Sequence, residues 1–325
     1  MKKIRFGIVG PGNIAKTFAR AIKIVNEAEL VAVASRDKAR GQAFADEFGI
    51  PNVLSSYEEM AACPDVDAVY IATPHPFHKP CAEIFLNAKK HVLCEKPVCV
   101  NADDAQKLYE CSVKNGVFLM EAMWTRFLPA TMKAIELVNS GEIGQVRAIT
   151  ADFCYNIEDM PGDKLFKNDM AGGSLLDVGV YAINFAGFFQ GYDPKEITAR
   201  CRVENGVDTH TAGILGYENG VTAYFTSALT VEKPENAYVY GSKGYLFIPN
   251  FYKAQRIIIN KGGSERTIDA PSLGNGFEEE IIEVCRCISQ GKTQSDIHPM
   301  SDSIKVLKIM DQMRKQNGIV YPADR

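Results

Sequence analysis

The stretch Ile4-Arg5-Phe6-Gly7-Ile8-Val9-Gly10-Pro11-Gly12-Asn13-Ile14-Ala15 joins a short apolar run, typical of a buried strand, to the pattern GxGxxA. Gly10 permits a tight turn, Gly12 lets the backbone approach a pyrophosphate, and Ala15 lets the next helix pack closely on the strand. Free N–H groups at the helix start, from Asn13 and Ile14, favour phosphate oxygens. The stretch therefore predicts a dinucleotide-binding turn; a strand–turn–helix without a ligand is the alternative.

Around this stretch, short β-branched runs alternate with segments of helical periodicity. Strands that are almost entirely apolar, separated by helices, indicate a parallel sheet covered on both faces. We expect a doubly wound Rossmann domain over residues 1–122, of class α/β. Its expected strands are Ile4–Val9, Leu30–Ala34, Ala68–Ala72, His91–Leu93 and Val117–Met120, and its expected helices are Ile14–Val25, Lys38–Phe48, Phe77–Ala88 and Ala102–Lys114.

After residue 122 the pattern changes to strands joined by hairpin-type turns such as Glu218-Asn219-Gly220. We expect a second domain, 123–325, of α+β type with an open, mainly antiparallel sheet. Its last helix either stays with this domain or packs back on the first. The expected strands are Gln145–Tyr155, Glu196–Glu204, Thr209–Tyr217, Val221–Thr230, Ala237–Tyr240, Tyr245–Ile248 and Arg256–Asn260, with helices Phe277–Ser289 and Ser301–Gln316.

The composition of the 325 residues is that of an ordinary globular protein. Lys+Arg 36 against Asp+Glu 40 gives a net charge of −4, which argues against nucleic acid or an anionic membrane as a partner. No continuous apolar run reaches the roughly eighteen residues of a membrane span. The nine cysteines form no CxxC pair and the five histidines no ligand spacing, so we expect a cytoplasmic protein without a metal.

The choice of dinucleotide should be made at the end of the second strand, where NAD enzymes commonly have an acidic residue. Here Ser35 and Arg36 follow the strand, and a hydroxyl beside a guanidinium suits the 2′-phosphate of NADP. Asp37 either caps the next helix or touches the ribose, so NAD stays as the alternative cofactor.

Three further motifs carry residues suited to chemistry. The loop Thr73-Pro74-His75-Pro76-Phe77-His78 and the segment Cys94-Glu95-Lys96-Pro97 both follow parallel strands, at the sheet edge where such folds bind ligands. Asp177 and Tyr181 are four residues apart at the start of an apolar helix, and therefore share one helical face.

GxGxxA, the Thr73–His78 loop, Glu95-Lys96-Pro97 and the segment 172–181 (GGSLLDVGVY) resemble, in this order, the glucose–fructose oxidoreductase/inositol dehydrogenase (Gfo/Idh/MocA) family. The resemblance covers essentially the whole chain. CEKP, the segment 120–127 (MEAMWTRF) and LLDVGVY resemble its dimeric dihydrodiol dehydrogenase branch. The resemblance implies NADP-linked alcohol or carbonyl chemistry, and association into a homodimer or higher oligomer through the open sheet face.

The resemblance also implies catalytic roles for Lys96 and for Tyr181, which stands where many relatives have histidine. A free tyrosine has a pKa of about 10, and a cationic neighbour lowers it. We assign Tyr181 as acid/base and Lys96 as its tuning partner, with the reverse assignment open. Asp177 is either a partner of substrate or lysine, or a helix N-cap.

The remaining predicted site residues are less determined. Glu95 is either near the nicotinamide or in a salt bridge, His75 contacts nicotinamide or substrate, and His78 either joins the cofactor site or packs and caps a helix. Trp124 is either an interdomain packing anchor or a wall of the substrate or nicotinamide pocket, and Phe153 and Tyr155 are candidate substrate walls. The predicted cofactor-binding set is Gly10, Gly12, Asn13, Ile14, Ser35, Arg36, Thr73, Pro74, His75, His78, Glu95, Lys96, Trp124 and Arg126.

The sequence thus predicts an NADP-dependent oxidoreductase that acts on a secondary alcohol or carbonyl of a sugar, polyol or cyclic diol. Two alternatives stay open: an NAD-dependent sugar or cyclitol dehydrogenase, and a dinucleotide-binding sensor that has lost catalysis. Lys96 and Tyr181 argue against the sensor, which would have no need for them.

Overall fold

The computed structural model describes residues 3–160 and 162–325, and they form two compact units. The first unit contains residues 1–99, 103–124 and 273–304, and the second contains 100–102, 125–272 and 305–325. This division differs from the predicted one, since the chain returns to the first unit after the second sheet is complete.

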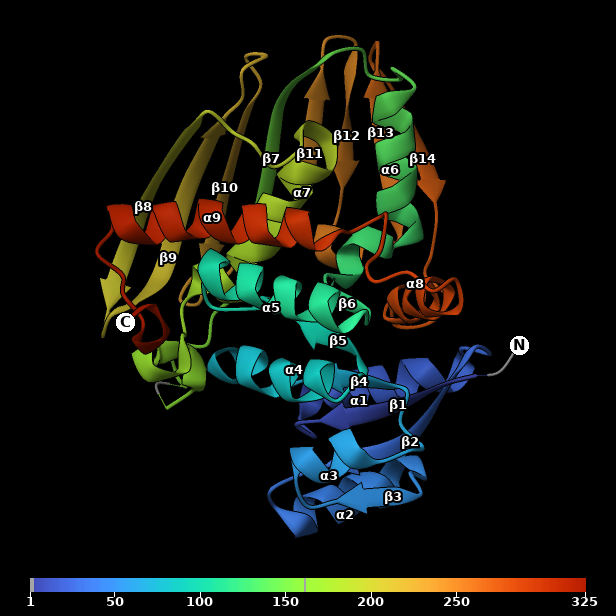
Figure 1. Cartoon of the computed structure of the whole chain (residues 1–325). Helices are drawn as coiled ribbons and strands as arrows, with labels where there is room; N and C mark the ends of the chain where they lie inside the picture. The colour runs from blue at the N-terminus through green and yellow to red at the C-terminus, as the bar shows by residue number, and fades with distance from the viewer. Residues whose placement is uncertain (1–2, 161) are drawn as a thin grey trace. The chain divides into compact units, whose positions relative to one another are not determined.

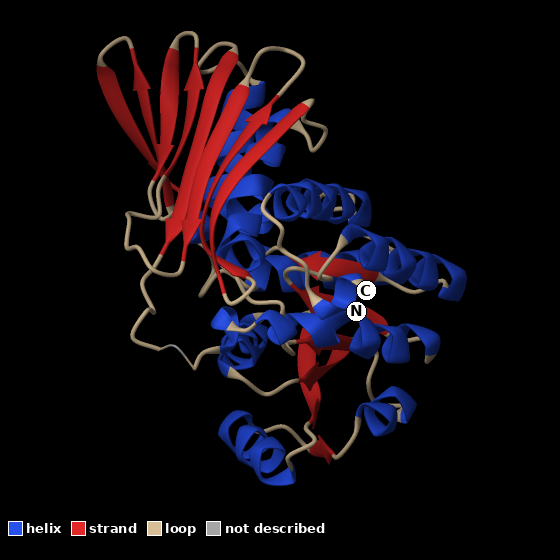
Figure 2. Ribbon diagram, turned by 90° about the vertical axis from the view of Figure 1, so that its left-hand side faces the viewer, coloured by secondary structure: helices blue, strands red, loops and turns tan. Residues whose placement is uncertain are grey.

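The first unit contains a six-stranded parallel sheet of order β3-β2-β1-β4-β5-β6, with helices on both sides (Figure 2). This is the strand order of the doubly wound dinucleotide-binding fold. The parallel strands β2 and β3 lie on one side of β1, and β4, β5 and β6 lie on the other, so the order in which strands are added switches sides between β1 and β4. The strands are β1 (Ile4–Val9), β2 (Ala28–Ala34), β3 (Asn52–Leu54), β4 (Ala68–Ile71), β5 (His91–Glu95) and β6 (Leu119–Ala122). The helices are α1 (Asn13–Ala21), α2 (Lys38–Phe48), α3 (Tyr57–Ala62), α4 (His78–Asn87), α5 (Ala102–Asn115) and α8 (Glu278–Ser289).

The second unit contains an eight-stranded sheet of order β14-β13-β12-β11-β7-β10-β9-β8 (Figure 1). Neighbouring strands are antiparallel except β7 and β10, which pair in parallel. The strands are β7 (Val146–Cys154), β8 (Glu196–Glu204), β9 (Val207–Gly216), β10 (Thr222–Ala228), β11 (Ala237–Gly241), β12 (Gly244–Ile248), β13 (Arg256–Lys261) and β14 (Ser264–Asp269). The predicted fold class is confirmed for both sheets.

One face of the large sheet packs on helices α6 (Pro129–Asn139) and α7 (Val180–Gln190), and most of α9 (Met300–Gln316) also belongs to this unit. The opposite face carries exposed apolar side chains, with Ile214 50% and Tyr224 48% exposed. On the same sheet the rings of Tyr238 and Phe247 stack with centroids 4.6 Å apart. The sheet is therefore open on one side, as the sequence predicted.

The segment Asn168–Gln190, which ends with α7, is long and apolar enough to cross a membrane by length and composition alone. However, 83% of its apolar window is buried inside the protein. A helix that packs on β7 and β10 needs an apolar surface all round, which explains its composition.

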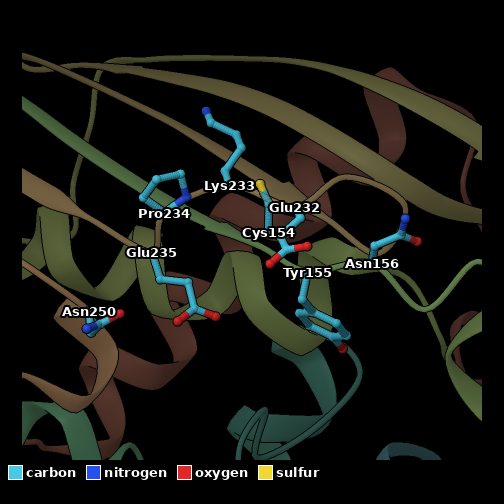
Figure 3. Close-up of a pocket in the computed structure, with 8 residues that line it drawn as sticks. All are labelled: Cys154, Tyr155, Asn156, Glu232, Lys233, Pro234, Glu235 and Asn250. Atoms are coloured by element: carbon cyan, nitrogen blue, oxygen red, sulfur yellow. The ribbon is translucent and has the colours of Figure 1, made fainter.

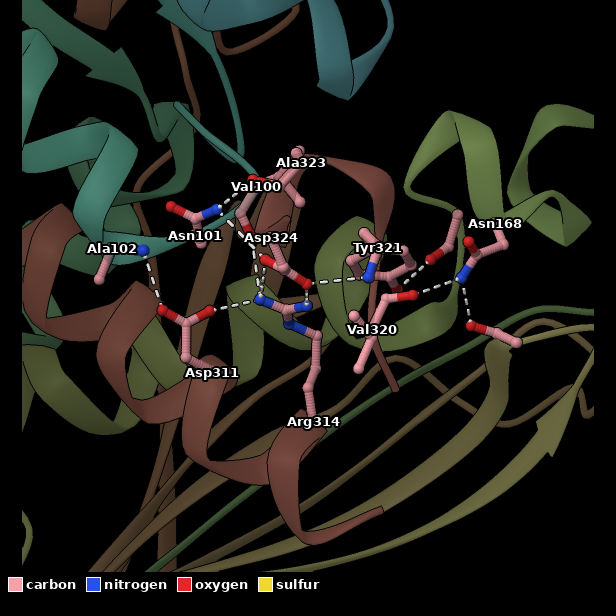
Figure 4. Close-up of polar contacts among 12 residues, drawn as sticks. Val100, Asn101, Ala102, Asn168, Asp311, Arg314, Val320, Tyr321, Ala323 and Asp324 are labelled. Carbon is pink, nitrogen blue, oxygen red and sulfur yellow. Dashed lines mark hydrogen bonds and ion pairs between the residues drawn. The ribbon is translucent and has the colours of Figure 1, made fainter. Parts of the chain in front are cut away.

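The chain's last residues are tied into the second unit by a buried arginine (Figure 4). The guanidinium of Arg314, 4% exposed, forms ion pairs of 2.6 Å with Asp311 and with Asp324. The hydroxyl of Tyr321 donates a hydrogen bond to the carbonyl of Gly172, in the segment that precedes Asp177. These contacts fix residues 321–324 against the glycine-containing segment.

Candidate active site

The glycine turn between β1 and α1 has the geometry that the sequence predicted. Gly10 has φ +81°, and a Cβ there would lie 2.8 Å from the carbonyl oxygen of Ala72, so only glycine fits. Gly12 precedes α1 in extended conformation and provides no side-chain cap for the N–H groups of Asn13 and Ile14. This cradle of small residues and uncapped N–H groups fits the pyrophosphate of a dinucleotide.

Two arginines, Arg36 and Arg40, lie on either side of the start of α2. The guanidinium of Arg36 lies 6.0 Å from the ring centroid of Phe77, and Arg40 Nε donates a hydrogen bond of 3.0 Å to the carbonyl of Pro11. Asp37 Oδ1 accepts from the backbone N–H of Arg40, so Asp37 is the N-cap of α2. Arg40 at the glycine turn and Arg36 just after β2 supply two guanidiniums, the group that suits a 2′-phosphate.

Arg40 was missed by the sequence reasoning. The signal that could have found it is its spacing, because it lies in the first turn of α2, four residues after Arg36. Ser35 is buried, and its Oγ accepts a hydrogen bond of 3.2 Å from the N–H of Asp37. Ser35 therefore shapes the end of β2.

His78 joins two of the predicted loops. Its ring nitrogens lie 2.7 Å from the carbonyl oxygen of Thr73 and 2.8 Å from that of Pro97, and the residue is 1% exposed. Both nitrogens are thus engaged by main-chain carbonyls, so His78 acts through the loops that it joins. His75, 8% exposed, packs its ring 5.9 Å from that of His78 in an edge-on arrangement.

The Glu95–Lys96 segment is fixed by buried acids. Glu95, 5% exposed, accepts hydrogen bonds from the hydroxyl of Tyr70 and from the backbone N–H of Lys96. Just beyond, Glu121 of β6 accepts a hydrogen bond of 2.9 Å from the N–H of Val98. Glu95 thus supports the loop that carries Lys96 from inside the sheet.

Glu121, another residue that the sequence reasoning missed, is itself held by His298, whose Nε2 lies 3.2 Å from Glu121 Oε2. Burial raises the pKa of Glu121, but hydrogen bonds from His298, Ser303 and Val98 outweigh it and lower the pKa below its usual range. A buried carboxylate that stays ionised can hold the Val98 N–H firmly.

Trp124, 8% exposed, stacks on Phe277 with ring centroids 5.0 Å apart, inside the first unit. Arg126 belongs to the second unit, where its guanidinium lies 5.2 Å from the ring centroid of Phe188. Trp124 and Arg126 therefore pack against residues of different units, although the sequence placed both in the predicted cofactor-binding set.

The second unit gathers an aromatic cluster around Tyr181. The ring of Phe153 lies 5.4 Å from that of Tyr181, 6.3 Å from that of Tyr155 and 4.3 Å from that of Tyr252. Phe153 and Tyr181 are 7% and 6% exposed. The predicted residues Phe153, Tyr155 and Tyr181 are thus brought together, and Tyr252, which no sequence pattern indicated, completes the cluster.

Asp177 is bonded to this cluster. Tyr155 donates a hydrogen bond of 2.6 Å from its hydroxyl to Asp177 Oδ2. Burial, followed by the charge of Asp177, raises the pKa of Tyr155 well above its usual range. The raised pKa and the hydrogen bond to Asp177 both favour the protonated phenol of Tyr155 over a base.

The interpretation of Asp177 as a helix N-cap is wrong, because Asp177 lies inside the π-helical turn Leu175–Gly179. The start of this turn is instead held by Asp208 of β9. Asp208 Oδ2 accepts hydrogen bonds of 2.7 Å from Leu175 N and from Ser174 Oγ. The same oxygen accepts a hydrogen bond of 2.8 Å from Thr211 Oγ1. Sequence reasoning missed Asp208 because it is 33 residues from Leu175.

Comparison with known proteins agrees with this arrangement. Residues 4–123 match the oxidoreductase family with an NAD-binding Rossmann fold, and residues 131–247 match the Gfo/Idh/MocA C-terminal domain. The chain belongs to the Gfo/Idh/MocA family. It is an NAD(P)-dependent oxidoreductase.

Within this family the chain is 36% identical to trans-1,2-dihydrobenzene-1,2-diol dehydrogenase of Mus musculus and 34% identical to that of Homo sapiens, over 99% of each chain. The resemblance to the family and to its dihydrodiol dehydrogenase branch is thereby confirmed.

Solved structures extend the comparison. A 3-ketoreductase from Actinomadura kijaniata, in complex with NADP and TDP-benzene, has a TM-score of 0.88 and 28% identity, over 97% of this chain and 98% of its own. An aldose-aldose oxidoreductase from Caulobacter crescentus, complexed with glycerol, has a TM-score of 0.89 and 27% identity, over 98% of both.

The residues of the family motifs thus divide between the units. Gly10, His78 and Lys96 belong to the first, and Asp177 and Tyr181 to the second. Among the residues that the structure describes, no three His, Cys, Asp or Glu side chains are grouped so as to hold a metal ion.

Proposed function

We propose that this protein is an NADP-dependent oxidoreductase that transfers hydride between the nicotinamide C4 and a secondary alcohol or carbonyl of a sugar or cyclic diol. The proposal is supported by the dihydrodiol dehydrogenase names of its relatives and by the NADP in the structure of the Actinomadura ketoreductase. Arg40, which is hydrogen-bonded to the glycine turn, and Arg36, which follows β2, support NADP over NAD.

The single observation that carries the mechanism is the hydrogen bond from Tyr155 to Asp177. The cluster contains three tyrosines: Tyr155 donates its hydroxyl to Asp177 and Tyr252 is hydrogen-bonded to Glu235, and we assign the proton exchange with the substrate oxygen to Tyr181. When bound, the nicotinamide supplies the hydride chemistry.

In this proposal the Tyr181 hydroxyl gives its proton to the carbonyl oxygen during reduction and takes it back during oxidation. The ammonium group of Lys96 polarises the same oxygen and favours the phenolate of Tyr181. Asp177, fixed by Tyr155, orients a substrate hydroxyl. Phe153 and Tyr252 exclude water and offer aromatic faces to the C–H face of a sugar or to a planar diol.

The reverse assignment has Lys96 as acid/base. A pH profile of kcat distinguishes the two, because a Tyr181→Phe variant retains the ionisation of a lysine base but loses that of a tyrosine base.

The experiment that tests the function combines NADPH fluorescence titration with turnover on aldoses, inositols and trans-dihydrodiols. Binding of NADPH with turnover of one of these classes is expected. Tight NADPH binding without turnover of any of them would contradict the enzymatic proposal and favour the sensor.

We also propose that two copies associate through the open face of the large sheet, where Ile214 and Tyr224 are about half exposed. Light scattering of the protein should give the mass of a dimer or higher oligomer, and charged substitutions at both residues should give the 35.8 kDa monomer. A wild type that is monomeric at all concentrations would contradict this.

The nine cysteines, all free thiols, support a cytoplasmic location.

A further inference from the structure

A pocket of about 560 Å³ lies in the second unit beside Tyr155 (Figure 3). Its polar lining comes from the end of β7, with Tyr155 and Asn156, from the loop with Glu232 and Glu235, and from Asn250. The volume falls within the range of small-molecule sites, which is about 300–1,000 Å³. The pocket is therefore large enough for one ring of a small ligand.

Two of the pocket's walls also touch the surroundings of Tyr181. Tyr155 donates its hydroxyl to Asp177. The Glu235 side chain forms a hydrogen bond with Tyr252, whose ring lies 6.0 Å from that of Tyr181, in an edge-on arrangement. Tyr155 and Glu235 thus join the lining of the pocket to the residues around Tyr181, all within this unit.

The chemistry of the lining selects the kind of ligand. It offers the carboxylates of Glu232 and Glu235 and the amides of Asn156 and Asn250, which accept and donate hydrogen bonds to hydroxyl groups. Both carboxylates favour hydroxyl donors; the charge of Lys253 acts on Glu235, so the repulsion of a phosphate comes mainly from Glu232.

Lys233 is the cationic residue among the described lining residues, but it is engaged elsewhere. Its Nζ lies 2.9 Å from Asp152 Oδ2 and 2.9 Å from Thr226 Oγ1. Figure 3 shows its amine directed away from the carboxylate of Glu235. The pocket therefore presents a polar lining with excess negative charge.

We propose that this pocket is a subsite for the distal ring of an uncharged, unphosphorylated saccharide, so that the enzyme binds disaccharides or glycosides better than monosaccharides, sugar phosphates or nucleotide sugars. The inference rests on the proposed function, since it requires a sugar at Tyr181. It distinguishes this chain from the Actinomadura ketoreductase, whose structure contains the charged ligand TDP-benzene. An aromatic diol is small enough to react without entering the pocket.

The test uses the full-length protein saturated with NADP+ and isothermal titration calorimetry with glucose, maltose, cellobiose and glucose 6-phosphate. At least one disaccharide should bind about tenfold more tightly than glucose, the gain that one or two net hydrogen bonds give. Glucose 6-phosphate should bind more weakly than glucose. Equal affinities for glucose and both disaccharides, or a preference for the phosphate, would overturn the subsite.

Variants locate the effect. Glu232→Gln combined with Asn250→Ala should reduce the advantage of the disaccharide to within about twofold. The matched control is Glu218→Gln, an exposed glutamate on the turn between β9 and β10, and it should keep the full advantage. A double variant that also keeps it would contradict the inference, whatever its stability.

Turnover is a separate readout. If disaccharides bind as expected but no sugar or diol is oxidised, the proposed function fails and the subsite stands. If glucose or a diol is oxidised and no disaccharide gains affinity, the subsite fails and the proposed function stands.

Discussion

The carboxylate of Asp208 accepts a hydrogen bond of 2.7 Å from the hydroxyl of Ser174, and thereby ties β9 to the turn that carries Asp177. The same carboxylate oxygen accepts from Leu175 N and Thr211 Oγ1. Asp208 is fully buried, so none of these donors has water as a substitute partner. The position of the turn depends on a residue that touches neither substrate nor cofactor.

Asp208→Ala should therefore lower the free energy of unfolding by about 1–3 kcal/mol, since it removes the buried acceptor that three donors share, of which Ser174 keeps a partner in Ser227 and Thr211 one in Cys201. A structural role alone would move stability only, whereas a positioning role should also reduce kcat at temperatures where the variant is folded. NADPH affinity should stay at the wild-type value because Asp208 lies in the second unit. Loss of stability with unchanged kcat would contradict the positioning role.

Tyr181→Phe should lower kcat by about 10²–10⁴-fold, because it removes the group that exchanges a proton with the substrate. The aromatic packing on Phe153 is retained, so the melting temperature should change little. Steady-state kinetics in both directions, with NADPH titration as a control for binding, measure this. Tyr155→Phe is the matched variant, and a larger kcat loss there than in Tyr181→Phe would exchange the two roles.

Arg36→Ala and Arg40→Ala should each weaken NADPH binding by about tenfold or more, while NADH affinity changes little, because the lost contact is a charge-assisted bond to the 2′-phosphate. Fluorescence titration with both coenzymes measures the ratio. Lys38→Ala, in the same helix, is the control. Equal losses for NADPH and NADH would show that the arginines support the turn only.

Glu280 gives a prediction on pH. Both of its carboxyl oxygens are buried without a hydrogen-bond partner among the described residues, and burial, followed by the charges of Glu95, Glu279 and Glu278, raises its pKa well above the usual range. The folded state therefore holds the Glu280 proton more tightly than the unfolded state. Stability from this group is full below the unfolded pKa and declines as the pH rises towards the folded pKa.

Glu280→Gln should remove this decline, because the amide stays neutral at every pH. We expect the variant to be more stable than the wild type by about 1–3 kcal/mol at pH 8–9, and the difference to shrink at pH 4. Thermal unfolding from pH 4 to pH 9 measures both. A variant less stable than the wild type at pH 9 would mean that Glu280 is ionised and bound to a partner.

The turns, strands and helices that depend only on residues close in sequence could be predicted from local sequence patterns. The turn at Gly10 and the strands around it were readable because a buried parallel strand, a glycine turn and a helix follow one another in the chain. The open sheet was readable from its hairpin turns. The strand β3 and the helix α3 were missed because three and six residues are too short for a period to emerge.

The edge strand β14 and the contacts between residues far apart in the sequence could not be predicted. β14 was missed because its side chains are almost all exposed and polar, so no alternation marks it. Glu121 meets His298 across 177 residues, and nothing in either neighbourhood records the other. The rings of Tyr252 and Tyr181 pack edge-on across 71 residues of sequence, and no local pattern records this contact. The sequence therefore predicted the residue types of the site, but not the residues that hold them.

Residues 321–324 are anchored to the segment that precedes Asp177, so a change in these residues is expected to disturb the proposed site. Tyr321 bonds to the carbonyl of Gly172, two residues before the Ser174 hydroxyl that Asp208 holds. Replacing Tyr321 and Asp324 would remove the bond to Gly172 and one of the two ion pairs of Arg314, and should lower activity although no residue of the site is changed. Engineered versions of the enzyme should therefore keep residues 321–324 intact.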